Sequence, residues 1–187
     1  MPTKSQKELA FLHDLYIATD WGERFAELVD QHVELPKEGR ALYVEAGTGS
    51  HALALQQRGG ARLTIVCADN NEECLELARA KGAALHEPIE FHREYASSLS
   101  FADEEFDLVL ANNSFSNPLQ LAANLSEAVR VAKPAATVAW WLPTASSFSE
   151  FFSIYWEALL NTGVADHEAE VEHLITNLPT VSDVESW

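Results

Sequence analysis

The chain is poor in cysteine, and it has no long apolar run. Cys67 and Cys74 are its only two cysteines, one inside an apolar strand-like run and one in a helical pattern. We therefore expect buried free thiols rather than a disulfide or a metal site. No segment is apolar over the length that a membrane span needs. These absences argue against a disulfide scaffold, a cysteine metal site and a membrane partner.

Basic residues are also scarce, with 12 Lys and Arg against 29 Asp and Glu and a formal net charge of −17. Such an acidic surface repels phosphate backbones, and no Lys/Arg cluster offers a local exception, so we expect no nucleic-acid partner. The acidity is typical of a soluble protein. Residues 1–7 lead into a mixed polar and apolar stretch rather than an apolar signal core, which predicts a cytoplasmic location.

The 47% apolar content of the 187 residues suffices to bury a core. Strand-like and helix-like patterns alternate along the chain, which predicts an α/β fold with a doubly wound, mainly parallel sheet. The expected strands are residues 40–45, 62–68, 88–93, 106–111 and 136–142, and the expected helices between them are 50–58, 71–81 and 118–132.

Further helices are predicted at both ends of the chain. Apolar residues at helical spacing over residues 9–29 predict two N-terminal helices, split near residues 19–22 and ended by residues 36–39. An aromatic helix is expected over 147–160 and an acidic helical stretch over 166–178. We expect the aromatic side chains of residues 148–156, with Trp140 and Trp141, to belong to the core or to face something outside this chain.

Three helix starts carry capping signals. Asn70 with Glu73 forms a capping-box pattern, and Ser182 with Glu185 forms another near the C-terminus. Asn117 precedes a proline, which predicts asparagine at the cap and proline in the first turn.

The most informative segment is Leu42–Leu53, where an apolar strand run breaks into a Gly47-x-Gly49 turn and then a helix. Glycines let the backbone turn tightly and approach a ligand that a Cβ would exclude, while the following helix offers unpaired N–H groups. Asp69 closes the next apolar run 22 residues past Gly47, where an acceptor for ribose hydroxyls is expected. This pairing predicts a nucleotide-like cofactor.

Five segments in this order resemble the class I S-adenosylmethionine-dependent methyltransferases over residues 38–162. The segments are Glu45–His51, Asp69–Arg79, Phe91–Phe101, Phe106–Phe115 and Arg130–Val138. The resemblance implies a Rossmann-like methyltransferase fold with S-adenosyl-L-methionine as cofactor. The cofactor-binding residues that it implies are Glu45, Gly47, Gly49, Asp69, Asn70, Tyr95, Ala96 and Asn112.

The resemblance does not name a catalytic residue or a metal ligand. Methyl transfer from a sulfonium mainly requires alignment, so few catalytic side chains are expected. Asn112 or Asn113 is placed to orient an acceptor, and His13, Tyr16 and His51 are the candidate bases if the acceptor must lose a proton.

Two residues depart from the family pattern, since His51 replaces the last loop glycine and Tyr95 replaces the usual aspartate of the third motif. The loop also has two possible registers. One places Glu45 at the acidic position, which we prefer, and the other places Tyr43 there and Glu45 at the first glycine.

The family closes its sheet with two further strands, and nothing strand-like follows residue 163. We therefore expect a C-terminally truncated fold, in which strand 136–142 is an apolar edge open to self-association. The expected organisation is cap helices in 1–35, a cofactor-binding core in 36–163 and a helical tail in 164–187.

The resulting functional hypothesis is methyl transfer to a small-molecule acceptor that the residues do not identify. One alternative is a non-catalytic methyltransferase-like binding module, motivated by the two departures and the missing strands. The other is an NAD(P)-dependent oxidoreductase, since Gly47-x-Gly49-x-x-Ala52 with Asp69 also satisfies the dinucleotide pattern.

Overall fold

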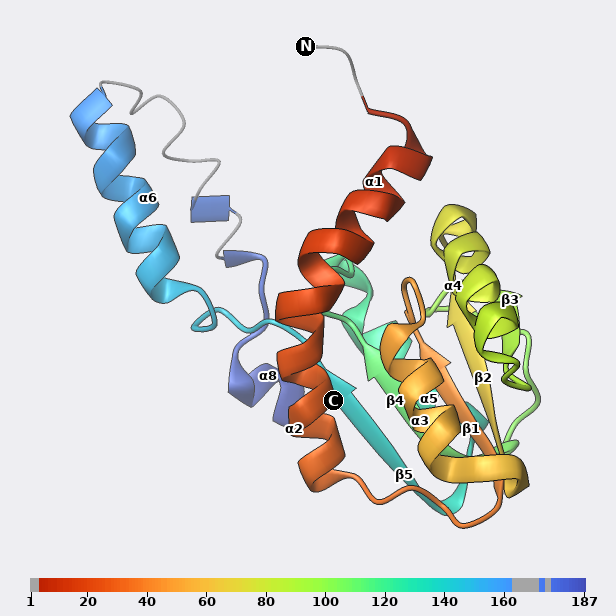
Figure 1. Cartoon of the computed structure of the whole chain (residues 1–187). Coiled ribbons are helices and arrows are strands. Elements are labelled where there is room, and N and C mark those ends of the chain that lie inside the picture. The colour runs from red at the N-terminus through yellow and green to blue at the C-terminus, as the bar shows by residue number, and fades with distance from the viewer. Residues whose placement is uncertain (1–3, 163–171, 174–175) are drawn as a thin grey trace. The chain divides into compact units, whose positions relative to one another are not determined.

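Five strands lie side by side in one sheet, in the order β3-β2-β1-β4-β5 (Figure 1). The computed structural model describes residues 4–162, 172–173 and 176–187. β1 pairs in parallel with β2 and β4, β2 pairs in parallel with β3, and the β5 arrow points the same way as β4. The predicted α/β fold with a doubly wound sheet is confirmed. The strands are β1 (Gly39–Val44), β2 (Leu63–Asp69), β3 (Glu90–Arg93), β4 (Phe106–Asn112) and β5 (Ala132–Trp141).

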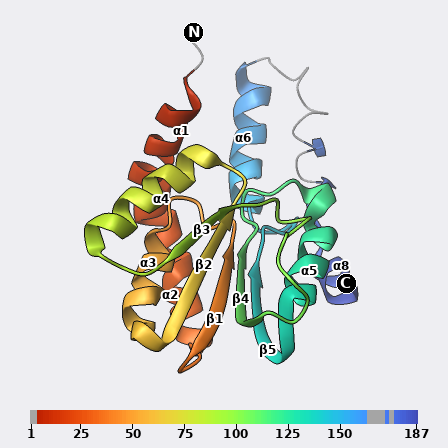
Figure 2. The ribbon, with the colours of Figure 1, turned by 90° about the vertical axis from the view of Figure 1, so that its right-hand side faces the viewer.

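Helices cover both faces of this sheet. Figure 2 shows α1 to α4 on one face and α5 on the other. The α-helices are α1 (Gln6–Leu12), α2 (Glu23–His32), α3 (Ser50–Gly59), α4 (Glu72–Leu85), α5 (Leu121–Val131), α6 (Ser149–Thr162) and α8 (Val181–Ser186). The other helical segments are the π-helix η1 (His13–Gly22) and the 3-10 turns η2 (Gly60–Arg62) and η3 (Pro118–Gln120).

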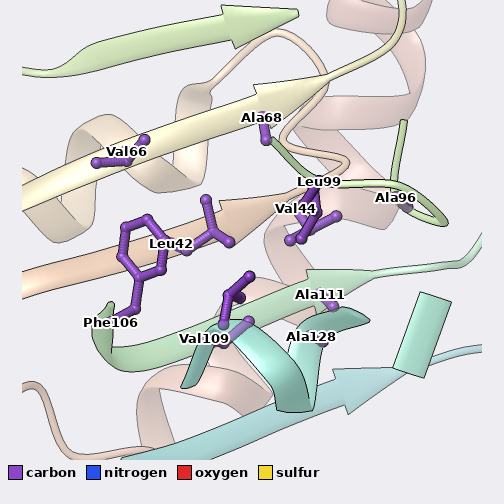
Figure 3. Close-up of a cluster of buried hydrophobic side chains, with 11 residues drawn as sticks. Leu42, Val44, Val66, Ala68, Ala96, Leu99, Phe106, Val109, Ala111 and Ala128 are labelled. Carbon is purple, nitrogen blue, oxygen red and sulfur yellow. The ribbon is translucent and has the colours of Figure 1, made fainter. Parts of the chain in front are cut away.

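The hydrophobic core is built from alternate residues of the strands. Leu42 and Val44 of β1 point to the α5 face, where they join residues of β2 and β4 and the α5 residue Ala128 in one buried cluster (Figure 3). Ala41 and Tyr43 alternate with them and are also buried. Both faces of the central strands are therefore covered, which explains their nearly continuous apolar sequence.

β5 begins at Ala132, four residues before the predicted start of that strand at 136. Lys133 and Pro134 are exposed, and Pro134 has no N–H to give to a neighbouring strand. An edge strand tolerates such a proline because one of its sides does not pair within the sheet. The sequence pattern missed this part of β5 because exposed residues give no apolar signal.

The predicted split of the N-terminal helices near residues 19–22 is wrong. α1, η1 and α2 follow one another without a turn, and Gly22 has helical angles of φ −62° and ψ −41°. At these residues the winding returns from π to α and the helix does not end. The hydroxyl of Thr19 donates to the carbonyl of Leu15 at 2.7 Å, so this polar side chain is satisfied within the helix.

Two predicted helix caps are displaced. The cap of α4 is Asn71, whose Oδ1 accepts the N–H groups of Glu73 and Cys74, and not Asn70. The reason is that the carboxylate of Asp69 accepts the Asn71 N–H and extends the turn by one residue.

Near the C-terminus, Thr180 and Asp183 form the capping box of α8, so the prediction of Ser182 with Glu185 is wrong. Asn117 caps η3 as predicted, with proline in the first turn. The capping-box pattern fits several neighbouring positions, and the path of the backbone decides which of them is used.

The chain divides into two units. One comprises Met1–Asn112 and Ala123–Trp140, and the other Asn113–Ala122 and Trp141–Trp187. In the second unit α6 lies within two residues of its predicted bounds but buries none of its residues, so the core interpretation of its aromatic side chains is wrong. Trp140, in the first unit, does pack against the buried cluster. The predicted stretch 166–178 falls mostly outside the described residues, and the predicted domain boundaries stay a prediction.

Both predicted free thiols are buried, which confirms that expectation for Cys67 and Cys74. Burial raises the pKa of both, to about 11 for Cys74. Within the described residues, no helix combines the length and the apolar character that crossing a membrane demands.

Candidate functional site

The carboxyl ends of β1, β2 and β4 meet at one edge of the sheet. Val44, the last residue of β1, lies beside Ala68 of β2 and Ala111 of β4. The predicted site residues Glu45 and Asp69 directly follow these positions. In open α/β sheets, ligands bind in the crevice beyond these strand ends. The topology therefore brings the candidate residues to the expected edge.

The loop between β1 and α3 depends on its glycines. Gly47 and Gly49 have φ angles of 57° and 74°, in the left-handed region that glycine adopts without strain. A Cβ on Gly49 would lie 2.9 Å from the Cβ of Ala78, so glycine at this position lets α3 approach α4. Around Gly47, the Cε1 atom of His13 is the one atom of the described residues that glycine-to-alanine replacement would bring within 4 Å of the added Cβ, at 3.6 Å.

Asp69 is a buried carboxylate that shapes this loop. Its Oδ2 accepts the Gly47 N–H at 2.7 Å, and its Oδ1 accepts the Asn71 N–H at 2.8 Å. Burial raises the pKa of Asp69, although the hydrogen bonds from Asn71 and Gly47 oppose that effect. A carboxylate has about four acceptor positions, so Asp69 keeps capacity for ligand hydroxyls.

The other predicted cofactor residues have differing environments. Asn70 is exposed next to Asp69, and Asn112 is half-buried at the end of β4. Tyr95 is 61% exposed on the turn after β3, whereas Ala96 belongs to the buried cluster of the core. The side chain of Ala96 thus packs in the core, so the predicted contact of Ala96 with the cofactor depends on its backbone alone.

The backbone at Glu45 bears on the register of the loop. Glu45 has a φ of 54°, in the region that favours glycine. The side chain of Tyr43 is buried, and its Oη lies 3.0 Å from Nδ1 of His51. The φ of Glu45 favours the second register, in which Glu45 occupies the first glycine position and Tyr43 the acidic one, over the register that we prefer from the sequence.

The three candidate bases are not equivalent. His13 lies beside Gly47, and burial lowers its pKa although Asp69 and Asp14 oppose the shift. A neutral imidazole of this kind is able to accept a proton. Tyr16 is 66% exposed. His51 is held between Tyr43 and the carboxylate of Asp30, and burial lowers its pKa.

Two residues at the loop were not identified from the sequence. Asp14 of η1 accepts hydrogen bonds from the Thr48 hydroxyl and from the ammonium group of Lys81 on α4. Lys81 also donates to the Thr48 carbonyl at 3.2 Å and to Oγ of Ser50 at 2.9 Å. No local motif marks these residues, since 67 positions separate Asp14 from Lys81.

In the part of the chain that the structure describes, no three His, Cys, Asp or Glu side chains lie close enough together to hold a metal ion. The chemistry of the site is that of a glycine turn, a buried carboxylate acceptor and polar groups at the strand ends. Such an arrangement suits a ligand with hydroxyl groups and a cationic group.

Comparison with known proteins adds family relationships to this geometry. Residues 41–135 match a family described as "Methyltransferase domain". The chain is similar to the demethylmenaquinone methyltransferase of Chlorobaculum parvum, with 34% identity over 126 residues, 67% of this chain and 50% of the relative. The protein of the same name from Deinococcus radiodurans is 30% identical over 149 residues, 78% of this chain and 61% of that relative. The chain thus spans half to three fifths of the length of these two relatives.

A solved structure gives a related match. The SAM-dependent methyltransferase of Methanosarcina mazei superposes with a TM-score of 0.53 at 26% sequence identity. The superposition covers 60% of this chain and 55% of the other.

Proposed function

This chain belongs to the methyltransferase domain family, because the family match covers just over half of its residues, and from this membership we propose its function. The chain binds S-adenosylmethionine and transfers a methyl group to a small-molecule acceptor. The observation that carries the proposal is the glycine loop at the carboxyl edge of the sheet, tied by Gly47 to the buried carboxylate of Asp69. The family match disfavours the oxidoreductase alternative, whose dinucleotide pattern uses the same glycines.

The residues present fit this cofactor. Asp69 retains acceptor positions for ribose hydroxyls, and the absence of a Cβ at Gly47 leaves space that His13 borders at 3.6 Å. These two features match the hydroxyls and the close approach that S-adenosylmethionine requires.

If bound here, S-adenosylmethionine would supply a methyl carbon activated by its sulfonium, with S-adenosylhomocysteine as the leaving group. The chain's contribution is alignment. Asp69 fixes the ribose end, and Asn112 at the end of β4 orients the acceptor. If the acceptor must lose a proton, His13 is the best-placed base, because it lies beside the loop and burial lowers its pKa.

The matched relatives indicate which acceptor to test first. Both relatives described above are named demethylmenaquinone methyltransferases, so demethylmenaquinone is that acceptor. The net charge of −17 supports a small molecule over a nucleic acid. We propose a cytoplasmic location, which cell fractionation tests.

Isothermal titration of this chain with S-adenosylhomocysteine, the demethylated product, tests the cofactor assignment, with NAD as a parallel control. We expect one site for S-adenosylhomocysteine and no heat with NAD. Because hydrogen bonds to a charged group contribute about 1.5–3 kcal/mol, Asp69→Ala should weaken binding by roughly tenfold or more. Circular dichroism checks that the variant stays folded.

Binding of NAD alone would contradict the proposal and favour the oxidoreductase. Binding of neither ligand would favour the non-catalytic binding module.

A further inference from the structure

Three segments that are distant in the sequence converge on the glycine loop. The carboxylate of Asp14, from the π-helix η1, accepts from the Thr48 hydroxyl and from the Lys81 ammonium. Lys81, from α4, in turn donates to the loop at the Thr48 carbonyl and the Ser50 hydroxyl. The loop is therefore held from two helices, in addition to the Asp69 contact from β2.

The ion pair is partly shielded from water. The side chains of Lys81 and Asp14 are 29% and 26% exposed, so water screens their interaction less than that of a surface pair. Burial raises the pKa of Asp14, but hydrogen bonds from Lys81 and Thr48 outweigh that effect, and the pKa lies below its ordinary value. Asp14 is thus a charged acceptor at neutral pH, and its bonds to the loop are the strong, charge-assisted kind.

The winding of the N-terminal helix changes at the point of contact. The π-helix begins at His13, which lies beside Gly47, and its second residue is Asp14. π-helical turns are rare and often mark functional sites, because they re-aim side chains that an α-helix would direct elsewhere. Two adjacent residues of η1 thereby reach the same loop.

We propose that Asp14 and Lys81 are positioning residues for the cofactor, which hold the Thr48–Ser50 segment in its binding conformation without being required to contact the ligand. This inference rests on the proposed function. It makes the N-terminal helix a component of the cofactor site rather than a separate cap.

The test compares S-adenosylhomocysteine binding by calorimetry in wild type, Asp14→Asn, Lys81→Met, the double variant and Lys81→Arg, well below each melting temperature. We expect Asp14→Asn and Lys81→Met each to weaken binding by about tenfold. The double variant should bind no more weakly than the weaker-binding single variant, because the two residues act as one unit. Lys81→Arg keeps the charge and should stay within about threefold of wild type.

A matched control is available in the same unit. Lys133 pairs with Asp107 at 2.8 Å, and Asp107 also accepts the Arg40 N–H, so this pair likewise joins a lysine, an aspartate and the backbone. It lies at the start of β4, at the opposite end of the sheet from the loop. We expect Lys133→Met to lower the melting temperature while leaving the dissociation constant within about twofold.

The outcomes separate the two proposals. If wild type binds S-adenosylhomocysteine and Lys81→Met binds it equally well, the positioning role is overturned and the proposed function stands. Equal loss of affinity in Lys81→Met and Lys133→Met would show general destabilisation and also overturn it. If wild type itself does not bind, the proposed function fails, and this inference fails with it.

Discussion

At the scale of single residues, Gly49 shows how one missing atom permits a contact between two helices. Any side chain at this position is disfavoured, because φ is 74° and an added Cβ would lie 2.9 Å from the Cβ of Ala78. We expect Gly49→Ala to lower the free energy of unfolding by about 2–4 kcal/mol, from backbone strain and overpacking together. Urea denaturation followed by tryptophan fluorescence measures this.

Gly47 provides the control for that substitution. It also has a positive φ, of 57°, but among the described residues an added Cβ would come no closer than 3.6 Å to another residue's atom, an ordinary van der Waals distance. Gly47→Ala should therefore show the strain alone, about 1–2 kcal/mol. Equal losses in the two variants would mean that the contact with Ala78 adds nothing.

His51 predicts a pH dependence of stability. Burial lowers its pKa from the ordinary 6.5, so the unfolded chain takes up a proton before the folded one does. This stabilising contribution is complete above about pH 6.5 and is lost as the pH falls through the folded-state pKa. We expect the free energy of unfolding to fall between pH 7.5 and pH 5.5.

In His51→Gln that fall should be smaller, and denaturant titrations at the two pH values compare the variant with wild type. The remaining slope is expected from His13, whose pKa is lowered in the same direction. If the free energy of unfolding of the variant falls as much as that of wild type between these pH values, His51 is not a source of the pH dependence.

At the scale of elements, Gln56 joins α3 to the first half of β2. β3 pairs only with Val66–Asp69, so the backbone of Leu63–Ile65 has no strand partner on that side. The Gln56 side chain takes the place of a strand partner. Its Nε2 donates to the Leu63 carbonyl and its Oε1 accepts the Ile65 N–H, both at 2.8 Å. This one side chain lets β2 extend beyond a short neighbour.

Gln56→Met keeps the volume but leaves these buried backbone groups without partners, which should cost roughly 3 kcal/mol of stability. The adjacent Gln57 is exposed, and Gln57→Met should change stability by less than about 0.5 kcal/mol. Thermal unfolding of the two variants measures the difference. Equal melting temperatures would contradict the assigned role of Gln56.

At the scale of the whole molecule, β5 is an edge of the sheet formed by the described residues. Exposed edge strands are templates for pairing with a second copy, and charged side chains on them prevent it. We expect the molar mass of the wild-type protein, measured by light scattering, to rise above that of a monomer as the protein concentration increases. Thr137→Lys, on an exposed position of β5, should restore the monomer.

The control variant is Gln57→Lys, which adds the same charge on α3. A wild-type protein that stays monomeric at all concentrations would argue against association through the edge. Association abolished equally by both lysine variants would point to net charge rather than to β5.

Much of this protein follows from its sequence alone. The order of strands and helices, the Gly47-x-Gly49 turn and the position of Asp69 depend on hydrophobic periodicity and on turn residues, which act between near neighbours in the chain. The family resemblance followed from these local segments for the same reason, and residues 41–135 match the corresponding family.

Tertiary structure alone decided how the loop is held. The contacts of Asp14 with Thr48 and Lys81 cross 34 and 67 positions, and they depend on a helix that continues through the predicted split at residues 19–22. The α4 cap lies at Asn71 because Asp69 accepts its N–H, and the φ of Glu45 favours the second register of the loop. Such outcomes depend on which groups packing brings within hydrogen-bond distance, and the local pattern of residues does not encode that distance.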